Sequence, residues 1–373
     1  MAPLSVVLML ACLLLSSGAA GLRIGLKPKH IHSNPDDTAS ELMRDALRRD
    51  MSRHYRLVRR ELASSGATIA APTRNDGPQG LQYLMPLAIG TPPVAFPAIV
   101  DTGSNVIMTQ CAPCGSKCGF EQTAPMYDPS ASTTFAELPC NSSLRLGFCD
   151  AIDGGANAPP GCPCTRNLTS GGWGGAAGMV GLGRRGNLSL VSQLGAGRFS
   201  YCLTPYHDGN STSTFFSGPA AALNDTGALS TPFVPSPSEG TKSTHYYLNL
   251  TGISLGNKLL SIPADAFSLS SDGSGGILID SGWTTTLLVD VAYHIVRAEI
   301  LSLATLAPES TPPPMPDMTL HFDGADMVLP SDNDMFLDSD GECCLWLHND
   351  TAAEGSVLGN YQQQNIHFLY DRP

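Results

Sequence analysis

The sequence predicts an all-β protein made of two related lobes. Glycine and proline supply 38 and 29 of its 373 residues, a share that suits many turns and disfavours long helical bundles. From residue 81 onward, short apolar runs alternate with glycine and proline, which is the pattern of strands joined by turns. One strand-and-turn sequence occurs in both halves of the chain, as expected for duplicated lobes.

The individual elements follow from the lengths and spacing of these apolar runs. Val289–Leu303 has apolar residues at helical spacing and is the one convincing helix of the second half. Proline-rich stretches at 232–238 and 308–316 are surface connections, and the first is a candidate linker between the halves. The expected strands are Leu81–Ile89, Ala95–Val100, Phe199–Leu203, Tyr246–Ile253, Gly276–Ile279 and Met318–Phe322.

The first twenty residues have the pattern of a signal peptide. An apolar run from Leu4 to Leu15 is followed by small residues where a signal peptidase would cut. The run is too short to cross a bilayer, which needs about 20 residues, and no later stretch reaches that length. We therefore expect residues 1–20 to be removed, no membrane span, and secretion to the cell exterior or wall, with the vacuole as an alternative.

Residues 21–79 are interpreted as a propeptide, because their charge opposes that of the body. Residues 22–62 carry ten Lys and Arg against six Asp and Glu, whereas residues 63–373 carry eleven against twenty-seven. Helical spacing over 36–62 fits a basic helix that docks on the acidic body, and it fits a membrane-surface helix or a solvated helix as alternatives. An acidic body repels phosphate, so no nucleic-acid partner is expected.

Cysteines and glycosylation sequons agree with secretion. Ten of the eleven cysteines lie beyond the leader, where an oxidising compartment favours disulfide bonds, although the sequence leaves their connectivity open. The disulfide candidates are Cys111, Cys114, Cys118, Cys140, Cys149, Cys162, Cys164, Cys202, Cys343 and Cys344. The glycosylation candidates are Asn141, Asn167, Asn187, Asn210, Asn224, Asn249 and Asn349.

Two matching loops carry the chemistry that the sequence indicates. The run Ala98–Ser104 contains Asp101-Thr102-Gly103-Ser104, and Ile277–Gly282 ends in Asp280-Ser281-Gly282. If the loops face each other, their carboxylates come within a few ångströms, and like charges so close share one proton. The ionised carboxylate then takes a proton from water while the protonated one polarises a carbonyl, which hydrolyses an amide without a metal or other cofactor.

These loops belong to a longer set of motifs that resembles the plant pepsin-type aspartic proteases of the nepenthesin-like branch. The motifs are Tyr83-Leu84-Met85, Ile89–Pro93, Asp101–Ser104, Thr109–Cys114, Gly178–Arg184, Leu188–Leu203 and Gly359–Gln364. The resemblance covers most of residues 22–373. It implies a bilobal all-β fold with a cleft between an N-terminal lobe (80–235) and a C-terminal lobe (236–373).

The resemblance also implies roles for particular residues. Asp101 and Asp280 form the catalytic pair, and the hydroxyls of two neighbouring residues cross-link the two loops. The loop residues that support the pair are Thr102, Gly103, Ser104, Ser281 and Gly282. Cys111, Cys114, Cys118 and Cys140 match the cysteine-rich insert of this branch. The expected protein is a monomeric secreted zymogen, an aspartic endopeptidase whose substrate is a polypeptide and whose other partner is its own propeptide.

Departures from the family pattern support a second interpretation. No tyrosine-bearing flap occurs before Gly178–Arg184, and the second lobe is shortened after Leu303 and lacks a final strand with its cysteine. Trp283 stands where the family has a threonine, and its bulk is expected to crowd the cleft. An indole cannot hydrogen-bond the Asp280 carboxylate as that hydroxyl does. The alternative is a catalytically impaired homologue that acts as a binding or inhibitor-type protein.

Other chemistry is disfavoured by the surroundings of its motifs. Gly181–Gly186 matches a dinucleotide fingerprint but has no βαβ unit around it. Cys111, Cys114 and Cys118 lack a fourth ligand for zinc, and apolar residues interrupt the acidic run 332–342 that a calcium loop would need. No HExxH sequence supports a metallohydrolase, and no serine lies in a Gly-x-Ser-x-Gly elbow between a strand and a helix, as a serine hydrolase would need. We therefore expect no metal and no cofactor.

Overall fold

The structure is a computed structural model in which most of the two lobes is described. The described residues are 5–10, 22–29, 82–112, 122, 124–136, 176–184, 188–206, 213–223, 227–236, 244–305, 315–337, 343–350 and 355–372. The expected helix over 36–62, the region where a flap is expected to be absent and most of the cysteine-rich insert lie outside these residues.

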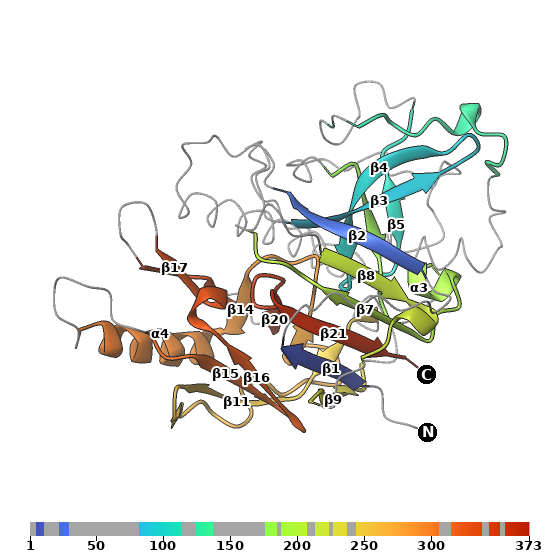
Figure 1. Ribbon diagram of the computed structural model, residues 1–373. Coiled ribbons are helices and arrows are strands. Elements are labelled where there is room, and N and C mark those ends of the chain that lie inside the picture. Colours follow the sequence, from blue (N-terminus) through green and yellow to red (C-terminus); the bar gives the residue numbers. More distant parts are fainter. Residues whose placement is uncertain are drawn as a thin grey trace, which may run out of the picture.

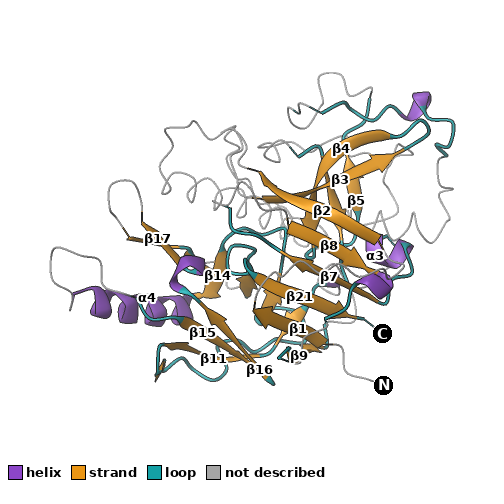
Figure 2. Cartoon of the chain, viewed as in Figure 1, coloured by secondary structure: helices purple, strands orange, loops and turns teal. Residues whose placement is uncertain are grey.

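Strands dominate the described part of the chain, and helices are few (Figure 2). The first strands are β1 (Ser5–Leu10), β2 (Leu22–Lys29), β3 (Gln82–Ile89), β4 (Val94–Asp101), β5 (Ile107–Thr109), β6 (Gly178–Gly181), β7 (Arg198–Cys202), β8 (Ser213–Ser217) and β9 (Leu229–Val234). They are followed by β10 (Tyr247–Leu248), β11 (Leu250–Leu255), β12 (Lys258–Leu259), β13 (Ile277–Ile279), β14 (Thr286–Val289), β15 (Met318–Phe322), β16 (Ala325–Leu329), β17 (Met335–Leu337), β18 (Cys343–Leu345), β19 (Leu347–Asp350), β20 (Ser356–Leu358) and β21 (Ile366–Asp371). The helical elements are α3 (Leu190–Gln193), α4 (Asp290–Thr305), η2 (Pro129–Ala131), η3 (Gly218–Ala220) and η5 (Ser331–Asn333).

The strands are arranged in one large sheet and two small ones. The large sheet has the order β19-β14-β20-β13-β10-β9-β1-β21-β7-β8-β2-β3-β4-β6-β5, and the small ones are β12-β11-β15-β16 and β17-β18. In Figure 1, β3, β4 and β5 lie in one lobe and β14, β15 and β16 in the other, with β7, β8 and β21 between them. The prediction of an all-β protein with two lobes is confirmed.

In the first lobe, a hairpin and a parallel strand position the first Asp-Thr-Gly loop. β3 and β4 pair antiparallel, and the turn between them contains Gly90, whose φ of +85° lies in the region that favours glycine. β6 lies parallel to β4, with Val180 beside Val100. Asp101 is the last residue of β4, so the loop leaves the sheet at this parallel pair.

The second lobe repeats this arrangement around the second loop. β13 pairs antiparallel with β10 and parallel with β20, which places Ile277 beside Ser356. Asp280 follows β13 directly. Helix α4 lies beside β14 and β19 and buries Ala292 and Val296, which are four residues apart and therefore share one helix face.

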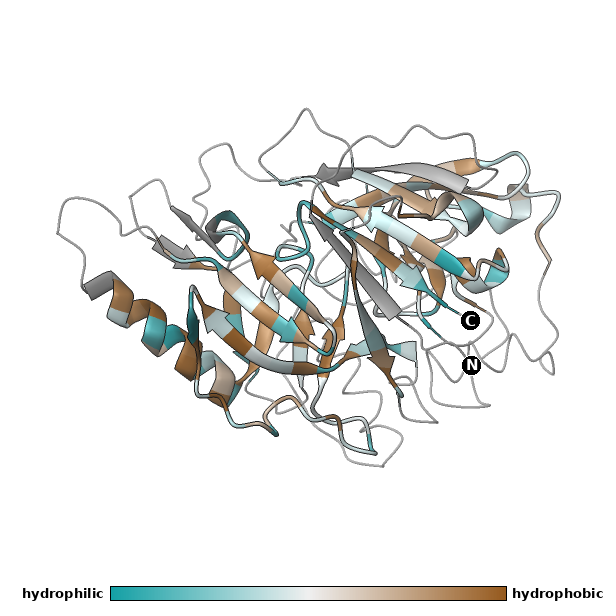
Figure 3. Ribbon diagram, turned by 60° about the horizontal axis from the view of Figure 1, so that its bottom comes forward, coloured by the Kyte–Doolittle hydropathy of each residue, from teal (hydrophilic) through white to brown (hydrophobic). Residues whose placement is uncertain are grey.

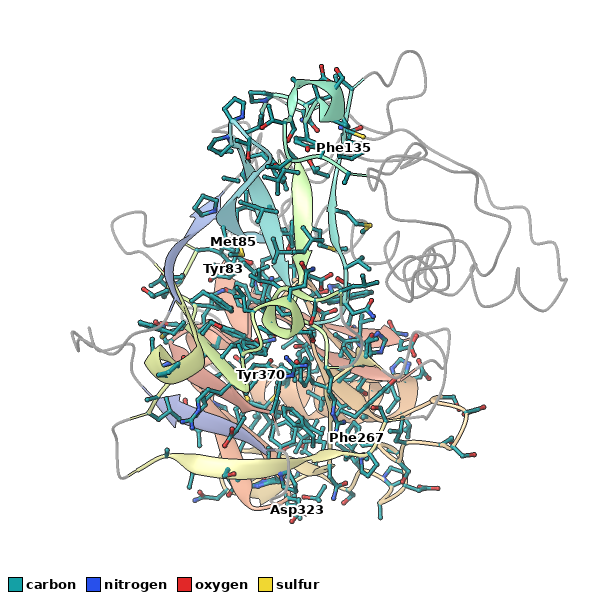
Figure 4. The ribbon with its side chains drawn as sticks, turned by 90° about the vertical axis from the view of Figure 1, so that its right-hand side faces the viewer. Tyr83, Met85, Phe135, Phe267, Asp323 and Tyr370 are labelled. Atoms are coloured by element: carbon teal, nitrogen blue, oxygen red, sulfur yellow. The ribbon has the colours of Figure 1, made fainter. Side chains whose placement is uncertain are left out.

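One apolar core runs through both lobes. Strands β15 and β16 alternate buried and more exposed residues, and Figure 3 shows this alternation of hydrophobic and hydrophilic residues along strands. Figure 4 places Tyr370 near the middle of the molecule, with Tyr83 and Met85 on one side and Phe267 on the other. Phe199 and Tyr370 stack with ring centroids 4.4 Å apart. Each large side chain buried in this way stabilises the fold by about 1.5–3 kcal/mol.

Most expected elements agree with the structure, and two unexpected strands come from the N-terminal region. Met318–Phe322 is β15 residue for residue, and the expected helix differs from α4 only at its ends. Tyr246–Ile253 is divided into β10 and β11 at Asn249. Strands β1 and β2 come from the segments interpreted as leader and propeptide, and both lie within the large sheet. No helix among the described residues is long and apolar enough to cross a membrane.

Candidate active site

The two Asp-containing loops lie buried and side by side between the lobes. Asp101 is completely buried and Asp280 is 4% exposed. In each loop the second residue after the aspartate donates its backbone N–H to the carboxylate: Gly103 to Asp101 Oδ1 at 3.0 Å, and Gly282 to Asp280 Oδ1 at 2.8 Å. The matching bonds hold both carboxylates in equivalent orientations within their loops.

Thr102 and Ser281 join the two loops to each other. The backbone N–H of Thr102 donates to Ser281 Oγ at 3.1 Å, and that of Ser281 donates to Thr102 Oγ1 at 2.9 Å. Each hydroxyl then donates to a backbone carbonyl of the opposite strand, Thr102 to Ile279 at 3.2 Å and Ser281 to Val100 at 2.9 Å. The loops are thereby brought together as the sequence suggests, with every one of these groups buried.

The next position differs between the loops. Ser104 donates its hydroxyl to Asp101 Oδ2 at 2.5 Å. Trp283, at the matching place, is 2% exposed and packs in a small apolar cluster with Leu278, Leu287 and Val357. The expected crowding of the cleft by a bulky indole is thus not what this structure shows, because the side chain is enclosed by apolar neighbours.

Buried amide and phenol groups form a hydrogen-bonded layer that contacts the second loop. Gln363 Nε2 donates to the backbone carbonyls of Asp280, at 3.3 Å, and Leu358, at 2.9 Å. Its oxygen accepts a 2.5 Å hydrogen bond from the Tyr201 hydroxyl, which also lies 2.8 Å from that of Tyr370. Burial raises the pKa of both tyrosines, so both hydroxyls remain protonated.

Two further amides contact the second loop. Asn360 Nδ2 donates to the Ser281 carbonyl at 2.9 Å, and Asn360 Oδ1 accepts from the Tyr206 hydroxyl at 2.5 Å. Gln82 Nε2, from β3 of the first lobe, donates to the Gly282 carbonyl at 3.3 Å. From sequence, Gly359–Gln364 was only a family motif, and Gln82, Tyr201 and Gln363 had no predicted role. The signal in the sequence that could have pointed to these residues is the run of amide side chains in Gly359–Gln364, which follows an apolar strand.

The predicted cysteine and asparagine sites are only partly described. Cys111 and Cys202 are buried and disulfide-bonded, Cys343 and Cys344 begin β18, and the other six candidates lie outside the described residues. Asn249 is exposed between β10 and β11, whereas Asn349 Nδ2 donates to Asp290 Oδ1 at 3.1 Å. The remaining five sequons lie outside the described residues. Glycosylation of Asn349 would replace one of the two Nδ2 hydrogens, which leaves one for this hydrogen bond.

A Ser-His-Asp chain lies elsewhere, on the four-stranded sheet, and its serine is the central residue of the Gly-x-Ser-x-Gly sequence Gly252–Gly256. The imidazole of His321 lies between the other two side chains. Ser254 Oγ is 2.7 Å from His321 Nε2, and His321 Nδ1 is 2.8 Å from Asp326 Oδ1. Strand β11, which carries Ser254, is paired on both edges, so its backbone N–H groups are committed to ladders. An acyl-transfer site needs free N–H donors for the oxyanion, so we interpret this chain as a structural cross-strand link.

The described residues give no indication of a metal centre. Among them, no group of three His, Cys, Asp or Glu side chains is placed to hold a metal ion. The acidic run considered for calcium begins at the exposed Asp332 and continues beyond the described residues.

Comparisons with known proteins agree with this geometry. Two protein-family models match, "Xylanase inhibitor N-terminal" over residues 83–172 and 156–218 and "Xylanase inhibitor C-terminal" over residues 245–312 and 302–373. Aspartic proteinase nepenthesin-1 of Nepenthes gracilis is 36% identical over 390 residues, which cover 92% of this chain and 86% of that protein. Aspartic proteinase nepenthesin-2 of the same plant is 34% identical, over 94% and 87%. The crystal structure of EDGP shares the fold, with a TM-score of 0.60 and 19% identity over 78% of this chain and 92% of that one.

Proposed function

We propose that this chain, which belongs to the nepenthesin-like family of plant aspartic proteases, hydrolyses peptide bonds with Asp101 and Asp280 as its catalytic pair. The observation that carries the proposal is the set of reciprocal hydrogen bonds between Thr102 and Ser281. These bonds hold two buried Asp-containing loops beside each other. Two buried carboxylates that are both ionised repel each other, and a shared proton removes this repulsion.

The surroundings of the two carboxylates suggest how the work is divided between them. The Ser104 hydroxyl donates to Asp101 Oδ2 and stabilises the ionised carboxylate, whereas Trp283 brings no hydroxyl to the same place beside Asp280. In our mechanism Asp101 takes a proton from the attacking water, and Asp280 donates the shared proton to the scissile carbonyl oxygen. Collapse of the tetrahedral intermediate then returns a proton to the leaving nitrogen. The pair titrates as a unit.

The direct test is cleavage of a quenched peptide library between about pH 3 and pH 5, where a carboxylate pair holds one proton. Asp101→Asn and Asp280→Asn keep the size of each side chain and should each lower kcat by about a thousandfold or more. A statine-type peptide, which imitates the tetrahedral intermediate, should inhibit the parent chain. Cleavage that persists in Asp101→Asn would show that another group, or a contaminant, is responsible.

We also propose how the protein is secreted, processed and glycosylated. We propose that residues 1–20 direct secretion, that residues 21–79 form a propeptide removed on activation, and that the lobes span 80–235 and 236–373. The opposite charges of residues 22–62 and 63–373 support docking of a basic propeptide on an acidic body. Glycosylation is best supported at the exposed Asn249. Intact-mass analysis of the secreted protein before and after acid treatment tests the two cleavage boundaries and the attached glycans.

A second candidate function is a binding protein without proteolytic activity. The replacement of the loop hydroxyl by Trp283 supports it, and both matching family models are named after xylanase inhibitors. If this candidate is right, a folded chain should cleave no peptide, even after Trp283→Thr, and should bind a glycoside hydrolase saturably in calorimetry. Cleavage by the unmodified chain would rule it out as the main function.

A further inference from the structure

Four completely buried side chains form a continuous run of contacts between the two Asp-containing loops. Tyr201 of β7 and Tyr370 of β21 lie on paired strands near the middle of the molecule (Figure 4), and their hydroxyl oxygens are 2.8 Å apart. At one end of the run, the Thr102 hydroxyl of the first loop contacts that of Tyr370. At the other end, Gln363 contacts the Tyr201 hydroxyl and the backbone carbonyl of Asp280 in the second loop.

Two backbone carbonyls fix the direction of the hydrogen bonds in this run. Carbonyl oxygens only accept, so Gln363 must point its Nε2 at those of Asp280 and Leu358, which lie at 3.3 and 2.9 Å. Its Oε1 therefore faces Tyr201 and accepts the single hydroxyl hydrogen of that residue at 2.5 Å. Because Tyr201 has no second hydrogen, Tyr370 must be the donor in the bond between the two phenols.

The oxygen of Tyr370 is the acceptor that remains for the first loop. Burial raises the pKa of Tyr370, and a hydrogen bond with the Thr102 side chain opposes this rise. The single hydroxyl hydrogen of Thr102 thus has two acceptors, the Tyr370 oxygen and the Ile279 carbonyl at 3.2 Å. In both orientations a lone pair of Thr102 stays free for the backbone N–H of Ser281, which donates to it at 2.9 Å.

We propose that Tyr370 and Tyr201 are positioning residues for the catalytic pair, because they complete a chain of hydrogen bonds that runs in one direction from the first Asp-containing loop to the second. Hydrogen bonds that follow one another in this way polarise and strengthen each other in a buried setting. The chain keeps the Thr102 oxygen available to the second loop and holds the second loop through Gln363. This inference rests on the proposed function and adds two buried phenols to the groups that set the relative position of the carboxylates.

The first test removes each hydroxyl from the full chain. Tyr201→Phe and Tyr370→Phe keep the aromatic rings and break the chain, so each should lower kcat about tenfold with KM unchanged. Tyr83→Phe is the matched control, because Tyr83 is also completely buried and its hydroxyl donates to the Thr204 backbone carbonyl, outside both loops. All three variants should lower the midpoint of thermal unfolding by about 3 °C, and Tyr83→Phe should change kcat by less than about twofold.

The double variant asks whether the two phenols act as one chain. Breaking a second link in a chain that is already broken costs little, so Tyr201→Phe combined with Tyr370→Phe should lower kcat about tenfold and not about a hundredfold. Losses that multiply would mean two independent contacts and would overturn the inference. Single variants that lose stability as Tyr83→Phe does and keep the parent kcat would also overturn it, because a purely structural role gives that result.

Thermal unfolding separates this inference from the proposed function. The bond between the two phenols is lost in both single variants, so the double variant should lose about 4 °C and not the additive value of about 6 °C. If the parent chain cleaves no peptide, the proposed function is wrong, and these midpoints alone decide whether the chain exists. Additive midpoints would refute the chain whatever the activity, whereas cleavage by the parent with additive midpoints would refute this inference alone.

Discussion

Thr102 and Ser281 hold the two Asp-containing loops together across the lobes, because the backbone N–H of each residue donates to the hydroxyl of the other. The two bonds are nearly equal in length, 3.1 and 2.9 Å, and both residues are completely buried. The relative position of the two carboxylates therefore depends on two hydroxyl groups, one from each half of the chain.

Thr102→Val should damage this junction without changing the size of the side chain. It leaves the Ser281 N–H and the Ile279 carbonyl without these hydrogen bonds, which should lower the free energy of unfolding by about 2 kcal/mol. A shift of the loops should also lower kcat about a hundredfold. Urea unfolding and peptide cleavage measure the two effects, and Thr102→Ser, which keeps the hydroxyl, should retain most of both.

Trp283→Thr should trade stability for activity. Removing the indole from Leu278, Leu287 and Val357 leaves a cavity and should lower the free energy of unfolding by about 3 kcal/mol. The new hydroxyl beside Asp280 should raise kcat by about tenfold, because it supplies the hydrogen bond that Ser104 makes on the other loop. Trp283→Phe is the control that keeps an aromatic ring and adds no hydroxyl. A loss of kcat in Trp283→Thr would show that the hydroxyl is not what limits Asp280.

Gln363→Leu tests whether the buried layer positions the second carboxylate. The variant loses the hydrogen bonds to the Asp280 and Leu358 carbonyls, so kcat should fall about tenfold with KM unchanged. Gln362→Leu is the matched control, because Gln362 is equally buried and its bonds go to Thr286, Asn333 and Trp346 instead. If both variants lose kcat equally, the effect of Gln363 is one of general stability.

Asp334 should make the fold more stable in mild acid than at neutral pH. The residue is 1% exposed and neither carboxylate oxygen has a hydrogen-bond partner. Burial, with smaller contributions from Asp317 and Asp332, raises its pKa to about 8. The folded state therefore keeps a proton that the unfolded state, with the ordinary aspartate pKa of 3.8, has already lost. Stability falls as the pH rises from about 4 to about 8.

Asp334→Asn should remove this dependence and raise the midpoint of thermal unfolding at pH 8 while changing it little at pH 4. The clearest window lies above pH 6.5, because His348 acts in the opposite direction below it. Burial lowers the pKa of His348 from the ordinary 6.5 to about 4, so its contribution to stability is lost as the pH falls through that range. Parallel pH profiles for the parent and Asp334→Asn above pH 6.5 would contradict the assignment.

The sequence was most informative where structure is local. A strand that runs into Asp-Thr-Gly or Asp-Ser-Gly is decided by neighbouring residues, and both loops could be located in this way. The strands around them could also be predicted, since apolar runs between glycine and proline report burial directly. The repeat suggested that the two loops face each other, and the resemblance to a known family implied the same pairing.

Apart from the contact between the two Asp-containing loops, contacts between residues far apart in the chain could not be predicted. Tyr201 and Gln363 are separated by 162 positions, and the Ser254-His321-Asp326 chain depends on the register of three strands. The place of Trp283 in an apolar cluster depends on Val357, which comes from another strand. Each of these is set by packing, for which a single sequence carries no separate signal.

Strands β1 and β2 have a mechanical consequence for the whole molecule. In the described sheet, β1 pairs with β9 and β21 and so joins the strands from β19 to β9 to the strands β21, β7 and β8. Strand β2 in turn joins β8 to β3. With both strands in place, rotation of one lobe against the other must stretch backbone hydrogen bonds. Without them, the lobes are connected by side-chain packing and by separate hydrogen bonds, such as those of Thr102 with Ser281 and of Gln82 with Gly282. The length of N-terminal chain that the protein retains therefore sets its bending stiffness.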